Sequence, residues 1–119
     1  MKLRTKRQKK KLDKFKFLRF SRKQKKLIYW WLPGSGHEDQ DTVIADGAIR
    51  SGKTIAMICG FLLWSKACFQ GESFIIAGKS MGALKRNVIK PLLRIVRAWG
   101  WSYDYNRSAN EIVIEGNTY

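Results

Sequence analysis

The stretch Gly47-Ala48-Ile49-Arg50-Ser51-Gly52-Lys53-Thr54 matches the phosphate-binding pattern G-x-x-x-x-G-K-[ST]. The glycines allow backbone angles that other residues resist, so such a loop can turn its N–H groups inward around an anion. Lys53 would then reach the β- and γ-phosphates, and the Thr54 hydroxyl would bind Mg²⁺. The alternative is a glycine-rich turn with a surface lysine. The flanking sequence favours phosphate binding, because a strand-like run precedes the loop and a helical pattern follows it.

Short apolar runs and longer helical patterns alternate around this loop. Residues 42–45 and 73–77 are each an apolar run of strand length, which predicts two buried strands. Residues 53–69 are apolar on nearly every side, which predicts a helix buried on more than one face.

Two further helices are marked by capping residues. Ser21 is placed to cap a short helix over residues 22–31, and Ser80 is placed to cap a longer helix that ends at Gly100. Pro91 lies inside the second helix, so we expect a kink in the three residues before it.

The end of the sequence has the pattern of a β-hairpin. Apolar and polar residues alternate over residues 101–105 and again over 111–115, with a turn over 106–110 between them. The resulting order β-α-β-α-β-β predicts an α/β domain with a mostly parallel sheet and a C-terminal β-hairpin.

The positive charge is concentrated at the start of the chain. Of the 119 residues, the first thirty contain fourteen of the 24 Lys and Arg and one of the nine acidic residues, so they carry most of the net charge of +15. We expect residues 1–16 to form a disordered basic arm. Such an arm attracts polyanions, with nucleic acid the commonest and an anionic membrane the rival, or it acts only as a solubilising tail.

The two cysteines and the apolar runs bear on the cellular compartment. Cys59 and Cys68 would be about 13–14 Å apart on a helix, too far for a disulfide, so we expect two reduced core thiols in a cytoplasmic protein. We find no signal peptide, and the longest apolar run is shorter than a membrane span requires.

Two polar residues have both an ordinary and a functional interpretation. Arg50 is either a solvent-facing loop residue or a cation that stabilises the γ-phosphate during hydrolysis. Gln24 is either an exposed helix residue or a contact for the adenine edge, because its amide offers both a donor and an acceptor.

The acidic groups needed for hydrolysis have no obvious place in this sequence. An apolar strand ending in Asp-Glu would bind Mg²⁺ and activate water, and no such strand occurs. Glu111 and Glu115 flank the hairpin strand and do not fit. We therefore expect an N-terminal fragment of a longer protein, with Tyr119 exposed.

The sequence resembles the N-terminal ATPase region of the large terminase subunit of tailed bacteriophages over about residues 20–119. Four features carry the resemblance: residues 20–24 before a Trp-rich helix; the Arg-containing loop at 47–54; the run 73–77 followed by Gly78-Lys79-Ser80; and the helix 84–91 leading to a hairpin that ends at 112–117.

The resemblance implies that residues 17–119 are part of a P-loop NTPase core of the ASCE/RecA-like class, without its Walker B strand or nuclease domain. It implies an ATP-driven motor that packs double-stranded DNA into a prohead, with a nuclease in the full protein. Gln24 would contact adenine, Lys53 and Thr54 would bind phosphate and Mg²⁺, and Arg50 and Lys53 would take part in catalysis. The implied partners are DNA, the portal protein, the small terminase subunit and further copies of the motor, in the host cytoplasm and away from membranes.

Two other functions stay open from the sequence. One is a P-loop helicase or another DNA-dependent ATPase, and the other is a nucleotide-binding fragment without turnover.

Overall fold

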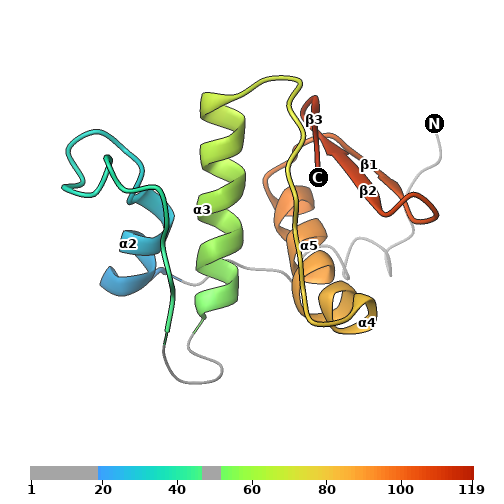
Figure 1. Cartoon of the computed structure of the whole chain (residues 1–119), viewed down its shortest axis with the longest axis horizontal. Helices are drawn as coiled ribbons and strands as arrows, with labels where there is room; N and C mark the ends of the chain where they lie inside the picture. Colours follow the sequence, from blue (N-terminus) through green and yellow to red (C-terminus); the bar gives the residue numbers. More distant parts are fainter. Residues whose placement is uncertain (1–18, 47–51) are drawn as a thin grey trace, which may run out of the picture.

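The computed structural model describes residues 19–46 and 52–119. The long helix α3 (Lys53–Cys68) lies between α2 (Arg22–Tyr29) on one side and α5 (Lys90–Ala98) on the other (Figure 1). A small sheet follows α5 at the end of the chain. The predicted basic arm falls in the part of the chain that is not described.

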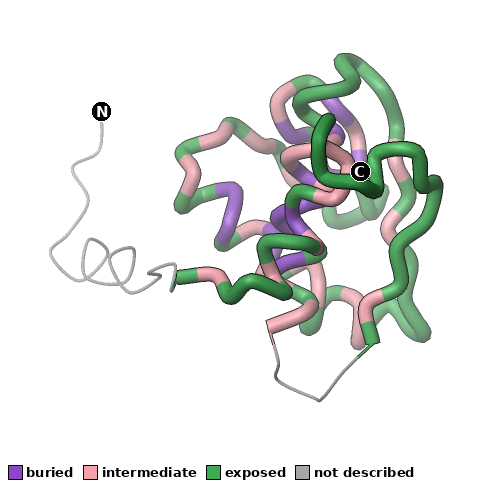
Figure 2. The backbone as a smooth tube through the Cα atoms, turned by 90° about the vertical axis from the view of Figure 1, so that its left-hand side faces the viewer, coloured by how far each residue is buried: buried purple, intermediate pink, exposed green. Residues whose placement is uncertain are grey.

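The core lies where these helices and the sheet meet. Figure 2 shows buried positions gathered there, while most of the connecting segments are exposed. Its buried apolar members are Ile28, Ala56, Ile58, Cys59, Leu62, Leu92, Ile95, Val96, Ile112, Ile114 and Tyr119. Because each fully buried leucine or isoleucine contributes about 1.5–3 kcal/mol, this cluster holds α3 to both of its neighbours.

The predicted helix caps are confirmed. The Ser21 hydroxyl accepts a hydrogen bond from the backbone N–H of Gln24 at 3.2 Å, so α2 begins at Arg22. Ser80 does the same for Ala83 at 3.2 Å, and the short helix α4 (Met81–Leu84) follows.

A π-helical turn, η1 (Lys85–Ile89), joins α4 to α5. The N–H of Lys90 donates to the carbonyl of Lys85, five residues back, and Pro91 lies in the first turn of α5. We predicted a kink at this position, and a π turn is one of the usual irregularities of a helix beside proline. The chain then leaves α5 at Gly100, whose φ is 72°.

The predicted hairpin is confirmed, and a third strand extends it. β1 (Tyr103–Asn106) pairs antiparallel with β2 (Glu111–Ile114), which pairs antiparallel with β3 (Asn117–Thr118). The turn between β2 and β3 has two residues with positive φ, Glu115 at 48° and Gly116 at 88°. This is the backbone of a tight hairpin turn, which the Glu-Gly sequence signals less clearly than Asn-Gly would.

The mostly parallel sheet predicted from the sequence is wrong for the described residues, although the α/β class is confirmed. Residues 42–45 and 73–77 have extended backbones but form no strand there, and the ladder is antiparallel apart from an isolated parallel bridge between Ser73 and Thr118. Unlike a helix, an extended segment becomes a strand only when a neighbour supplies its hydrogen bonds. The two runs lie on opposite sides of α3, so neither pairs with the other (Figure 1).

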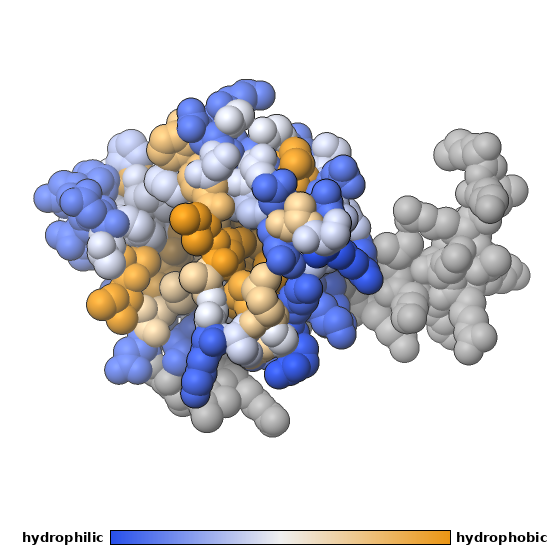
Figure 3. Space-filling model, turned by 45° about the vertical axis from the view of Figure 1, so that its right-hand side comes forward, coloured by the Kyte–Doolittle hydropathy of each residue, from blue (hydrophilic) through white to orange (hydrophobic). Residues whose placement is uncertain are grey.

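The second of these runs borders a surface groove. Residues 73–76, α4, η1 and the sheet enclose a groove of about 350 Å³. Apolar residues gather on this side of the molecule (Figure 3), and Ile75 is 90% exposed. Within this run Phe74 and Ile76 pack against the core, and of its large apolar residues only Ile75 is left at the surface.

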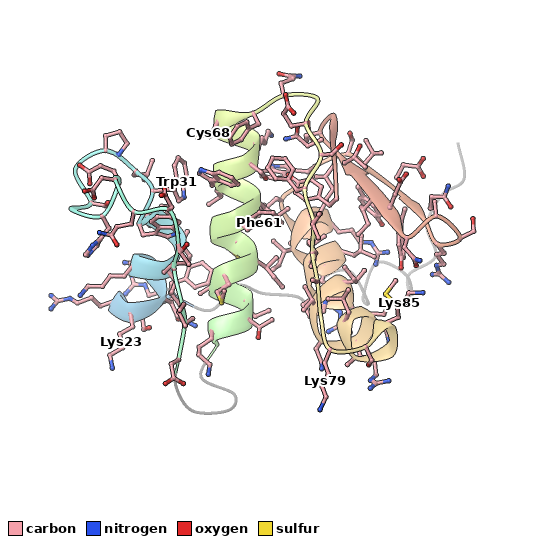
Figure 4. The ribbon with its side chains drawn as sticks, in the orientation of Figure 1. Lys23, Trp31, Phe61, Cys68, Lys79 and Lys85 are labelled. Atoms are coloured by element: carbon pink, nitrogen blue, oxygen red, sulfur yellow. The ribbon has the colours of Figure 1, made fainter. Side chains whose placement is uncertain are left out.

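The expectations for Cys68 and Tyr119 are also corrected. Cys59 is buried as expected, and burial raises the pKa of its thiol to about 11. Cys68, in contrast, is exposed in the last turn of α3 (Figure 4). Tyr119 is buried rather than exposed, because its ring packs on Phe61 and Phe74 of the core.

Candidate nucleotide-binding site

The N-terminal end of α3 is the centre of the candidate site. Gly52 is the residue before the helix, and its φ of 79° is a left-handed angle that glycine adopts readily. Lys53 and Thr54 are the first two residues of the helix, the first half-buried and the second exposed. No acidic residue lies in the first turn, so this helix end retains its attraction for an anion.

The rest of the predicted phosphate loop cannot be compared with the structure. Gly47, Ala48, Ile49, Arg50 and Ser51 lie outside the described residues. Their roles, including the catalytic role considered for Arg50, stay predictions.

Gln24 lies next to the loop, although 28 residues separate it from Gly52 in the sequence. Its side chain completes a capping box, in which the Oε1 atom accepts a hydrogen bond from the N–H of Ser21 at 2.8 Å. Its Nε2 atom donates to the carbonyl of Gly52 at 3.4 Å. The structure therefore brings together two residues that the sequence analysis assigned to one nucleotide site.

This contact depends on a close approach between α2 and α3. A Cβ atom on Gly52 would lie 2.2 Å from Nε2 of Gln24, and one on Gly60 would lie 2.7 Å from the carbonyl oxygen of Leu27. The Leu27 carbonyl is backbone and cannot rotate away, so this packing requires glycine at position 60. At Gly52 the Gln24 amide could shift, and it is the φ of 79° that favours glycine. Gly60 was not predicted as a site residue, and its only sequence signal is a glycine inside a helix, where glycine is usually unfavourable.

The metal prediction rests on Thr54 alone. Its exposed position at the start of α3 is compatible with a hydroxyl that binds Mg²⁺ beside a phosphate. Within residues 19–46 and 52–119, no three His, Cys, Asp or Glu side chains are grouped closely enough to bind a metal by themselves.

Comparison with solved structures connects this geometry to known proteins. The chain is similar to the large terminase from a thermophilic bacteriophage, with 39% sequence identity and a TM-score of 0.82 over 85% of this chain. Structures of the same terminase in complex with ADP and with ATP-γ-S match over 84% of the chain, each with 39% identity and a TM-score of 0.80. The chain belongs to the large terminase family of bacteriophages.

The match covers only part of a large terminase. The chain spans 26% of the length of the thermophilic phage protein. No protein-family model and no curated protein matches the sequence, so the relationship to terminases rests on the solved structures.

Within residues 19–46 and 52–119, no helix is both long enough and apolar enough to cross a membrane.

Proposed function

We propose that this chain is the ATP-binding part of a viral DNA-packaging motor, in which ATP hydrolysis drives double-stranded DNA into a prohead. The observation that carries the proposal is the contact between Gln24 and Gly52 in a chain 39% identical to a terminase solved with ADP and ATP-γ-S. The identity to terminase favours a packaging motor over a helicase or another DNA-dependent ATPase.

Each predicted site residue has a defined role in this proposal. The backbone N–H groups of residues 47–52 surround the phosphates, and Lys53 neutralises the β- and γ-phosphates. Thr54 binds Mg²⁺ through its hydroxyl, and Arg50 stabilises the charge that develops on the γ-phosphate.

Replacing Lys53 by alanine tests the nucleotide site. Isothermal calorimetry with ATP and Mg²⁺ should show binding to the unaltered chain and none to Lys53→Ala, because a charge contact to the phosphates is removed. Lys66→Ala removes the same charge from an exposed position in the last turn of α3, at the opposite end of the helix, and should retain binding. Equal affinities in the unaltered chain and Lys53→Ala would contradict the assignment.

Turnover distinguishes a motor fragment from a complete enzyme. We expect the 119-residue chain to bind ATP weakly and to hydrolyse it negligibly, because its sequence contains no apolar strand ending in Asp-Glu. A hydrolysis rate near that of a complete packaging motor would overturn this expectation.

The basic arm is proposed as a contact for double-stranded DNA. Neutralising phosphates releases counterions, so deleting residues 1–16 should flatten the dependence of DNA affinity on salt. An unchanged slope would reduce the arm to a solubilising tail.

The portal protein, the small terminase subunit and neighbouring motor subunits are further proposed partners.

A further inference from the structure

The exposed side of η1 and α5 carries a row of positive charge. Four exposed basic residues, spaced four, four and three positions apart, make up this row: Arg86, Lys90, Arg94 and Arg97. We call them the basic row. Residues at this spacing share one side of a helix. The other side of α5 is buried through Leu92, Ile95 and Val96 in the core that α5 shares with α3 and the sheet, so the basic row faces away from that core.

No acidic residue balances the basic row. Residues 73–103 contain six Lys and Arg and no Asp or Glu. Within residues 19–46 and 52–119, no carboxylate forms an ion pair with Arg86, Lys90 or Arg94. A surface that serves only solubility usually mixes charges of both signs. A row of one sign instead attracts a polyanion.

Tyr103 holds the last arginine of the row in place. Nε of Arg97 donates to the Tyr103 hydroxyl at 2.6 Å, and the guanidinium carbon of Arg97 lies 5.6 Å from the centre of the tyrosine ring. A guanidinium has five N–H donors, and this contact uses one of them. Because the side chain is already held, Arg97 loses less conformational entropy when its other donors bind a phosphate.

The length of the row suits several phosphates of one DNA strand. With a rise of about 1.5 Å per residue, the helical segment from Arg86 to Arg97 is about 16 Å long. Each strand of a duplex has one phosphate for about 3.4 Å of helix axis, so this length matches about five phosphates. Long Lys and Arg side chains can therefore reach several phosphates of one strand from one side of the helix.

The surroundings of the row favour nucleic acid over a protein or a membrane. Protein interfaces usually have an apolar centre, whereas none of the exposed large apolar side chains belongs to η1 or α5, both of which the structure describes in full. A membrane-binding helix inserts its apolar side into lipid, but that side of α5 is buried in the core. Repeated positive charge without an apolar centre is the pattern that a phosphate backbone selects.

We propose that the basic row is a second DNA-binding surface of this chain, which contacts the phosphates of one strand of a DNA duplex without reading its sequence. The choice of DNA as the polyanion rests on the proposed packaging function. The inference adds to that function a contact on the described helices, separate from residues 1–16 and from the nucleotide site at the start of α3.

Neutralising two residues in the middle of the row tests the proposal. Lys90→Gln/Arg94→Gln removes two charges at exposed positions, where glutamine is a good helix former. Lys23→Gln/Lys66→Gln is the matched control, because it removes two exposed charges from α2 and α3 (Lys23 is labelled in Figure 4). The affinity of each full 119-residue chain for a fluorescent DNA duplex, about two helical turns long, is measured by anisotropy at several salt concentrations.

The expected result is a weaker dependence of DNA affinity on salt. Each phosphate contact contributes about 0.9 to the slope of log affinity against log salt, so the slope should fall by about 1.8 in Lys90→Gln/Arg94→Gln and by less than about 0.5 in the control. Lys90→Arg/Arg94→Lys keeps both charges and should retain the slope. An unaltered slope in Lys90→Gln/Arg94→Gln, or an equal reduction in the control, would overturn the inference and leave the proposed function standing.

Two further measurements separate the basic row from other sites and partners. ATP affinity, measured by calorimetry, should be the same in Lys90→Gln/Arg94→Gln and the unaltered chain, and a loss would refute the separation from the nucleotide site. Poly-glutamate takes the place of DNA in a parallel titration, and a larger loss of affinity for it than for DNA would assign the row to an acidic protein instead. If the unaltered chain bound no DNA duplex, the DNA contact in the proposed function would itself fail.

Discussion

The two ends of α3 differ in how they are joined to the rest of the protein. At its start, Gln24 contacts Gly52 across a half-buried position with a hydrogen bond of 3.4 Å. At its end, Asn117 is 1% exposed and bonds to three backbone groups: its Nδ2 atom donates to the Ser65 and Phe69 carbonyls at 3.2 and 3.3 Å, and its Oδ1 atom accepts from the Glu72 N–H at 3.1 Å.

The buried end of α3 has a second polar contact beside Asn117. The Ser65 hydroxyl is hydrogen-bonded to the Tyr119 hydroxyl, and the Tyr119 ring packs on Phe61, which projects from α3 toward the sheet side of the molecule (Figure 4). We call Asn117, Ser65 and Tyr119 the C-terminal clasp. It holds the C-terminal end of the helix through buried groups, whereas the bond between Gln24 and Gly52 at the other end is only half-buried.

The largest effect on stability should come from Asn117→Ala. Losing this side chain leaves the Glu72 N–H and two carbonyls without their buried partner, which should lower the free energy of unfolding by about 2–4 kcal/mol. Urea unfolding monitored by tryptophan fluorescence measures this loss. Asn87→Ala, an exposed asparagine in η1, is the matched control and should stay within about 0.5 kcal/mol of the unaltered chain. Similar losses in both variants would contradict the role of the clasp.

A smaller effect is expected from Tyr119→Phe. This change retains the ring on Phe61 and Phe74 but removes the hydroxyl that meets Ser65, so it should cost about 1 kcal/mol. A double-mutant cycle with Ser65→Ala measures the coupling between the two hydroxyls, and additive losses would show that they do not interact. Tyr103→Phe loses an exposed hydrogen bond from Arg97 and should cost less.

Helices and strands differ in how well the local sequence predicts them. α3 was predicted to run to residue 69, and it ends at Cys68. The sequence predicts it this closely because a helix satisfies its hydrogen bonds within its own segment. Residues 42–45 and 73–77 have equally apolar patterns, but pairing depends on a neighbouring strand that no local pattern describes. β3 was missed for a similar reason, since it has two residues and is defined by its pairing with β2.

The sequence predicts those features of the candidate site that depend on the chemical groups of single residues. The charge of Lys53, the hydroxyl of Thr54 and the amide of Gln24 are all evident from the sequence, and the structure places the Gln24 amide against the Gly52 carbonyl. The closeness of α2 at Gly60 was not predictable, because it depends on which backbone faces that glycine in the folded chain.

The smallest effect on stability should come from the start of α3, with Gln24→Ala. This variant loses the bonds to the Ser21 N–H and to the Gly52 carbonyl, and water can replace much of both because the position is only half-buried, so the cost should be about 0.5 kcal/mol. Its effect on ligands should be larger, with ATP affinity falling about tenfold, since the base loses its contact. Gln40→Ala changes the same side chain in an exposed loop and should alter neither quantity. A loss of stability as large as that of Asn117→Ala would mean that both ends of α3 are structural, whereas a small loss of stability joined to a large loss of ATP affinity assigns the N-terminal end to the ligand.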